Sequence, residues 1–122
     1  FRTSPDVVWN LLRKLRAAAY HYHEGAALRE AAEAAGITPK DFKADTSDTA
    51  AGMYPGRYRK TYVNRSGERE QIVLGPHLKG GGTGNRNDTV CIYWYLDNDP
   101  VHGNRFVVGH VGAKLKDSTG GY

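Results

Sequence analysis

The sequence predicts an α+β domain in which two or three N-terminal helices pack on a small, mainly antiparallel four-stranded sheet. Apolar residues recur at helical spacing over residues 1–43, and the spacing changes to two from residue 57 onward. A chain of 122 residues is expected to form one domain with two layers. We therefore expect residues 1–122 to form a single unit, helical over 1–43 and rich in strands over 57–116.

A first helix is expected to begin at Ser4 and Pro5. A serine hydroxyl caps a helix, and proline is tolerated in the first turn because its missing donor costs nothing there. Leu11 and Leu15 then belong to an apolar stripe at three-and-four spacing, with basic residues between its members. The pattern predicts an amphipathic helix that ends near residue 22.

A second helix is expected over residues 26–35, which are rich in alanine, with Gly36 as its left-handed cap. Residues 38–43 resemble another cap and first turn, which indicates a short third helix. The two together resemble a helix-turn-helix segment, whose second helix would lie in a major groove. Residues 44–56 are small, polar or turn-forming and predict a loop.

A hairpin is expected after this loop. Residues 57–63 interleave tyrosines with basic side chains, as in a strand. Residues 64–67 have the composition of a turn, and residues 71–74 are expected to form the returning strand. Residues 77–82, which end in three glycines, are interpreted as a loop.

Two more strands are expected in the last third of the chain. Alternation over residues 90–96 places Trp94 on one face of the strand and Tyr93 and Tyr95 on the other. A turn-rich connection then leads to residues 105–111, the last expected strand. These strands and the hairpin are expected to form the four-stranded sheet, with the helices on one face.

Net charge is placed unevenly along the chain. Residues 1–56 carry seven basic and seven acidic side chains, whereas residues 57–122 carry ten basic and six acidic ones. The whole net charge of +4 therefore belongs to the strand-rich half. Such an excess indicates a polyanionic partner, and a charge that only keeps the protein soluble is the alternative.

Several classes of protein are disfavoured by composition. No apolar run approaches the roughly 18 residues that would span a membrane, and no signal peptide pattern opens the chain. Cys91 is the one cysteine, which excludes an internal disulfide and a cysteine metal cluster. His21, His23 and Glu24 form at most a weak metal site, because a spacing of two does not place both histidines on one helical face. We expect a cytoplasmic protein without metal or other cofactor.

His110 lies in an apolar strand between two glycines. A glycine within a strand often marks a bulge or a close approach by another group. His110 would share the face of Phe106 and Val108 unless a bulge at Gly109 turns it to the other face. A half-buried, hydrogen-bonded histidine is one interpretation, and a general acid or base is the other.

Tyrosines and basic side chains suggest contacts with nucleic acid. Tyr93 and Tyr95, like the tyrosines of the hairpin, would suit stacking on unpaired bases, and a sheet face covered by protein would have the same composition. The glycine-rich loop lies between Lys79 and Arg86 and could offer backbone donors to a phosphate, or simply connect two strands. The expected nucleic-acid-binding residues are Arg57, Arg59, Lys60, His77, Arg86, Tyr93, Tyr95, Lys114 and Lys116.

The last third of the chain also resembles the C-terminal half of RelE/ParE-superfamily toxins. The resemblance is carried by Leu78-Lys79-Gly80, by the aromatic strand at 91–97 and by Phe106-Val107-Val108-Gly109-His110. It implies helices packed on a small antiparallel sheet. Many members of the family are ribosome-dependent endoribonucleases, and others act on gyrase. The ribonucleases use basic side chains, often with a tyrosine or histidine, rather than metal.

The resemblance implies roles for individual residues. Lys79 matches the loop lysine of the family, His110 its last-strand histidine, and Tyr122 a C-terminal tyrosine if the tail folds back. A base would remove the ribose 2′-hydroxyl proton, a cation would stabilise the phosphorane, and an acid would protonate the leaving oxygen. The expected catalytic residues are His110, Lys79, Arg105 and Tyr122.

Three functions are therefore weighed. The first is an RNA-directed toxin-like domain acting as a metal-independent endoribonuclease, with a protein partner such as an antitoxin. The second is a non-catalytic nucleic-acid-binding module, with RNA favoured over DNA, within a larger defence or regulatory system. The third is a protein-interaction domain whose basic face is incidental.

Overall fold

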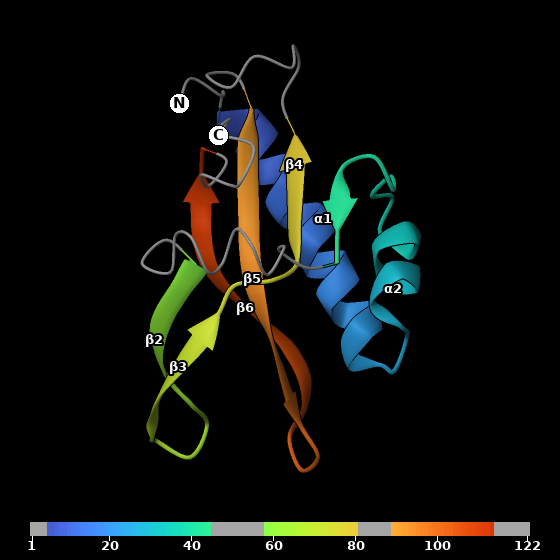
Figure 1. The fold of residues 1–122 in the computed structure, drawn as a ribbon. Coiled ribbons are helices and arrows are strands. Elements are labelled where there is room, and N and C mark those ends of the chain that lie inside the picture. Colours follow the sequence, from blue (N-terminus) through green and yellow to red (C-terminus); the bar gives the residue numbers. More distant parts are fainter. Residues whose placement is uncertain (1–4, 45–57, 81–88, 114–122) are drawn as a thin grey trace.

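A four-stranded antiparallel sheet organises the part of the chain that the computed structural model describes, which is residues 5–44, 58–80 and 89–113. Helices cover one face of this sheet, and a β-hairpin packs on the other (Figure 1). The α+β class and the mainly antiparallel four-stranded sheet expected from the sequence are thus confirmed.

Two helices occur in the described residues. The first, α1 (Pro5–His23), buries one stripe at three-and-four spacing, which consists of Leu11, Leu15, Ala18 and Tyr22. The second, α2 (Leu28–Ala34), is shorter than expected and packs on α1 through alanines. Neither helix of the described residues is both long and apolar enough to cross a membrane.

Six strands form two separate sheets in the described residues. They are β1 (Phe42–Lys43), β2 (Arg59–Val63), β3 (Arg69–Val73), β4 (His77–Gly80), β5 (Val90–Asp99) and β6 (Gly103–Gly112). The larger sheet has the order β1-β4-β5-β6, and β2 pairs only with β3. The expectation that the hairpin joins the main sheet is therefore wrong, because β4 occupies the place beside β5.

The expected third helix is not formed. Residues 39–41 make a turn, and Phe42 and Lys43 form β1, which pairs with Leu78 and His77 of β4. Burial decides this outcome, because the Phe42 ring stacks on Trp94 at 6.2 Å in the core and so overrides the local cap signal. Since residues 38–44 contain no helix, the helix-turn-helix interpretation is also wrong.

Residues 77–80, expected in a loop, form a strand between β1 and β5. Leu78 points into the core, whereas His77 and Lys79 lie on the opposite face. Only three residues, 77–79, alternate before the run of glycines, and such a short pattern does not distinguish a strand from a loop. Pairing with β5 supplies the stability that the local sequence lacks.

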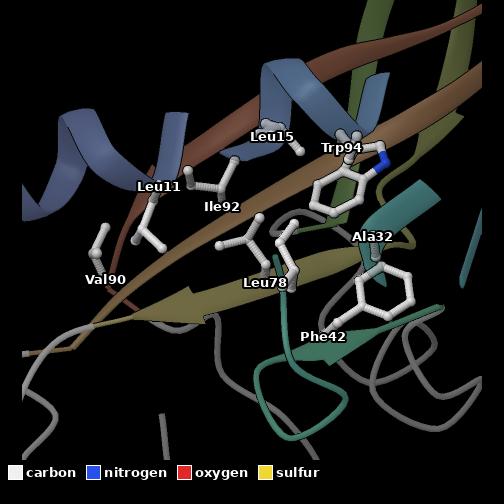
Figure 2. Packing of buried hydrophobic residues seen from close by; sticks show 10 residues of the cluster. Leu11, Leu15, Ala32, Phe42, Leu78, Val90, Ile92 and Trp94 are labelled. Carbon is white, nitrogen blue, oxygen red and sulfur yellow. The ribbon is translucent and has the colours of Figure 1, made fainter. Parts of the chain in front are cut away.

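The main core lies between α1 and the larger sheet (Figure 2). Leu11 and Leu15 of α1 belong to one buried cluster with Ile92 and Trp94 of β5. Each such side chain contributes about 1.5–3 kcal/mol when it leaves water. Because α1 and β5 are fixed by this cluster, the opposite face of β5 provides a rigid base for the hairpin.

Candidate nucleic-acid interface

A bulge in β6 determines which way His110 points. Tyr93 pairs with His110, but the next residue of β5, Trp94, pairs with Val108, so Gly109 is an extra residue. His110 is thereby turned to the face away from the helices. A Cβ atom at Gly109 would lie 2.4 Å from Leu74 Cδ2, so the hairpin approaches the strand closely at this glycine.

The bulge aligns two histidines around one tyrosine, and we call His77, Tyr93 and His110 the histidine row. Its ring centroids are 4.5 Å apart between His77 and Tyr93 and 5.7 Å apart between Tyr93 and His110. His110 is half-buried and donates from Nε2 to the Ala113 carbonyl at 2.7 Å. His77 donates from Nδ1 to the Gly75 carbonyl at 3.0 Å.

Two tyrosines of this face, Tyr58 and Tyr93, are too buried for the base stacking that was expected of them. Tyr93 is 1% exposed and Tyr58 is 2% exposed, and their rings meet edge to face at 5.9 Å. Tyr95 is half-buried beside Tyr62. Burial, and then the charge of Glu70, raise the pKa of Tyr95. In this arrangement the Tyr58 and Tyr93 rings pack the hairpin on the sheet and offer no face to a base.

Two of the expected catalytic cations, Lys79 and Arg105, do not lie close together. Lys79 is exposed on the face of the histidine row and pairs across the sheet with Cys91. Arg105 lies on the same face but pairs with Asp97. Cys91 and Asp97 are six positions apart along β5, which is roughly 20 Å at the rise of a strand. Lys79 and His110 therefore share one end of the sheet, and Arg105 lies at the other.

Arg105 is also engaged by an acid that sequence reasoning missed. Asp97 Oδ2 accepts from Arg105 Nε at 3.0 Å and from the Tyr62 hydroxyl at 2.7 Å, and Arg65 Nε lies 3.4 Å away. Burial favours a higher pKa for Asp97, but the bonds from Tyr62 and Arg105 and the charge of Arg65 outweigh it and lower that pKa. The hydrogen bond with Tyr62 raises the pKa of Arg105.

This cluster attaches the hairpin to the sheet. Arg65 donates to the Asp97 carbonyl at 3.3 Å, and Arg105 also bonds the Tyr62 hydroxyl. At the tip of the hairpin, the Asn64 side chain accepts from the amides of Ser66 and Glu68, and Gly67 adopts a φ of +83°. Such a turn, with a left-handed glycine before the returning strand, is a common three-residue hairpin.

The surface of the hairpin that points away from the sheet is open to solvent. It consists of alternate residues of β2 and β3, which are Arg59, Thr61, Val63, Arg69, Gln71 and Val73. We call this surface the ribbon face. All six side chains are exposed, including 56% of Val63 and 43% of Val73. The ribbon face carries two cations and no acid.

The two faces of the hairpin differ sharply. Tyr62 and Ile72 point toward the main sheet, and Lys60 shares their side in a half-buried position. Of the two expected binding residues that the structure describes on the hairpin, Arg59 lies on the ribbon face and Lys60 does not. Arg69 was not among them because the returning strand was expected to begin at residue 71, and Gln71 was not among them because only basic and aromatic side chains and one histidine were considered. Continuing the period of two across the turn would have found both.

Other expected residues are placed as follows. Arg57, Arg86, Lys114, Lys116 and Tyr122 lie outside the described residues. His23 donates from Nδ1 to the Asn104 carbonyl at 2.9 Å, and His21 meets the Tyr20 ring. No group of three metal-binding side chains occurs in the described parts of the chain.

A shallow groove of about 390 Å³ on α1 is lined by Trp9, Leu12, Arg13 and Arg16, on the side of the helix away from the sheet. It gives the molecule a second exposed surface with two arginines, remote from the hairpin.

Comparison with family models, curated proteins and solved structures found no match to this chain.

Proposed function

We propose that this chain is a nucleic-acid-binding module that contacts its ligand through the ribbon face. The observation that carries the proposal is the charge of that face, where Arg59 and Arg69 are exposed and no acid is among its six residues. Glu68 lies in the turn before Arg69, and Glu70 belongs to the other face of the hairpin. Elsewhere on the same side of the molecule, Arg105 is paired with Asp97. Unpaired cations on an exposed sheet release counterions from a nucleic acid when they bind phosphates, which drives association at low salt.

The test is the salt dependence of binding to fluorescently labelled DNA and RNA, measured by anisotropy. Affinity should fall linearly with salt on a logarithmic scale, and Arg59→Ala with Arg69→Ala should reduce the slope by about 2. Heparin, another polyanion, should compete for the same two cations. Absence of binding to any nucleic acid at low salt would contradict the proposal and leave the protein-interaction alternative.

A second candidate function keeps the toxin-like resemblance. An RNA-directed, metal-independent endoribonuclease is favoured by one observation, which is that the bulge brings His110 to the face of His77 and Lys79. One histidine would take the 2′-hydroxyl proton and the other would protonate the leaving 5′-oxygen. This leaves a 2′,3′-cyclic phosphate and a 5′-hydroxyl, with Lys79 stabilising the phosphorane charge.

RNA cleavage in the presence of a chelator tests this second function. His110→Ala should abolish cleavage, whereas His102→Ala, at an exposed turn beside Asp99, should leave it unchanged. Cleavage that survives His110→Ala, or that stops when chelator is added, would exclude the mechanism. Membership of the RelE/ParE superfamily, a protein partner such as an antitoxin, and a cytoplasmic location are part of the same proposal.

A further inference from the structure

We infer that the ribbon face enters the major groove of duplex DNA and contacts base edges there. This inference rests on the proposed function and specifies its ligand. It differs from the expected preference for RNA, which depended on tyrosine rings. Tyr58 and Tyr93 are buried, and the ribbon face itself carries no aromatic side chain.

The dimensions of the hairpin fit a major groove. Two paired strands lie about 4.8 Å apart, and a major groove about 12 Å wide admits a two-stranded ribbon with its side chains. Each strand of the ribbon has five residues, Arg59–Val63 in β2 and Arg69–Val73 in β3. Such a strand extends roughly 13 Å, which is close to the rise of four base pairs.

The side chains of the ribbon face are of types that read bases. Arginine donates two hydrogen bonds to guanine, glutamine pairs with adenine, and the methyl groups of threonine and valine contact the thymine methyl. Thr61 and Gln71 face each other at the middle of the ribbon. Arg59 lies opposite Val73, and Val63 lies opposite Arg69, so the two cations occupy diagonal corners around a polar centre.

The other forms of nucleic acid fit this surface less well. A-form RNA has a deep, narrow major groove that side chains cannot read. Proteins that bind single strands supply aromatic platforms for the bases, and the six residues of the ribbon face include none. Charge and shape therefore favour B-form duplex DNA as the occupant.

The inner side of the hairpin holds the ribbon in place before any ligand binds. Tyr58 and Ile72 are buried against the sheet, and Tyr62 is bonded to Asp97. A surface whose backbone is already ordered loses less conformational entropy when it binds. The ribbon face is thus prepared for a rigid groove rather than for a partner that must fold onto it.

The experiment measures binding of a short mixed-sequence DNA duplex, its two single strands and an RNA duplex of the same sequence. The duplex is also prepared with glucosylated hydroxymethylcytosine, which fills the major groove. Wild type is compared with Arg59→Ala/Arg69→Ala and with Arg13→Ala/Arg16→Ala, a matched loss of two charges on the opposite side of the molecule. Thr61→Val/Gln71→Leu removes the polar centre without changing charge.

We expect wild type to prefer the DNA duplex and to lose at least about tenfold in affinity when the groove is filled. The ribbon arginine variant should lose a similar factor, and the helix variant less than about twofold. The charge-neutral variant should keep the salt slope and lose part of the preference for the unfilled duplex over the filled one.

Three results would overturn the inference. If the protein binds nucleic acid but prefers single strands or RNA, or is indifferent to the filled groove, the ribbon does not enter the major groove and the proposed function stands. If both arginine variants lose affinity equally, the contact is unspecific electrostatics. If no nucleic acid binds at all, the inference and the proposed function fall together.

Discussion

Asp97 is the residue on which attachment of the hairpin depends. Its carboxylate accepts from Tyr62 and Arg105 and pairs with Arg65, so removing its charge leaves two guanidinium groups without their acid. Hydrogen bonds to charged groups contribute about 1.5–3 kcal/mol each, and removal of one partner leaves the other without a hydrogen bond. The position of the ribbon face therefore depends on this carboxylate as well as on the buried contact between Tyr58 and Tyr93.

Asp97→Asn should lower the free energy of unfolding by about 1–3 kcal/mol at neutral pH, measured by urea denaturation. Because folding lowers the pKa of Asp97, its contribution is fully present above the unfolded value of about 3.9. That contribution is lost as the pH falls through the folded value. The difference between wild type and Asp97→Asn should thus shrink below about pH 4.

Glu68→Gln, at an exposed position in the turn, serves as the control and should change stability by less than about 0.5 kcal/mol. A difference between wild type and Asp97→Asn that stays constant from neutral to acid pH would show that Asp97 is not the titrating group.

Gly109 is a second residue whose identity is dictated by packing. Gly109→Ala would place a methyl group 2.4 Å from Leu74 Cδ2 and should destabilise by about 1–3 kcal/mol, measured by thermal unfolding. Gly112→Ala, in the same strand, meets its nearest atom at 3.4 Å and should cost less. In a Leu74→Ala background the cost of Gly109→Ala should nearly vanish, and an undiminished cost would mean that the bulge rather than the contact requires glycine.

At the scale of elements, those with a long local period were predictable from the sequence. The first helix, the hairpin, β5 and β6 all show their period over five residues or more. The strands β1 and β4 do not, because Phe42 and Leu78 are decided by burial and by pairing with distant residues. The division of the strands into two sheets also depends on contacts between residues far apart in the sequence. For that reason the hairpin was expected to pair beside β5, whereas it packs on the face of the sheet.

The site was predictable to a similar extent. Composition indicated a basic, strand-rich half, and the bulge at Gly109 was among the alternatives for His110. The sequence could not show which tyrosines are buried. Alternation along a strand assigns side chains to two faces, but it does not show which face another part of the chain covers. Asp97 was missed for the same reason, since its partners Tyr62 and Arg65 belong to the β2–β3 hairpin and its turn, which do not pair with the main sheet.

The end of α1 contacts the β5–β6 hairpin through the buried Tyr22 as well as through His23. Tyr22 donates to Asn98 Oδ1 at 2.9 Å, so Tyr22→Phe should cost about 1 kcal/mol in a urea unfolding titration. Tyr20→Phe, at a position 62% exposed on the same helix, should have an effect below about 0.5 kcal/mol. Equal effects of the two substitutions would argue against the hydrogen bond as the cause.

At the scale of the whole molecule, the sheet separates two exposed surfaces with different compositions. The groove on α1 combines Trp9 with arginines, and the ribbon face combines arginines with small polar and branched side chains. The histidine row lies on the same face of the sheet as Lys79, and its three side chains are buried or half-buried. Nucleic acid is expected on the ribbon face, whose six described residues are exposed and include two cations and no acid.

Backbone amide chemical shifts, recorded while the DNA duplex is added to isotope-labelled protein, test this expectation most directly. The account predicts that the largest shifts fall on residues 59–63 and 69–73, whereas the α1 residues that line the groove stay unchanged. Shifts concentrated at His77 and His110, or along α1, with the hairpin amides unmoved, would contradict it.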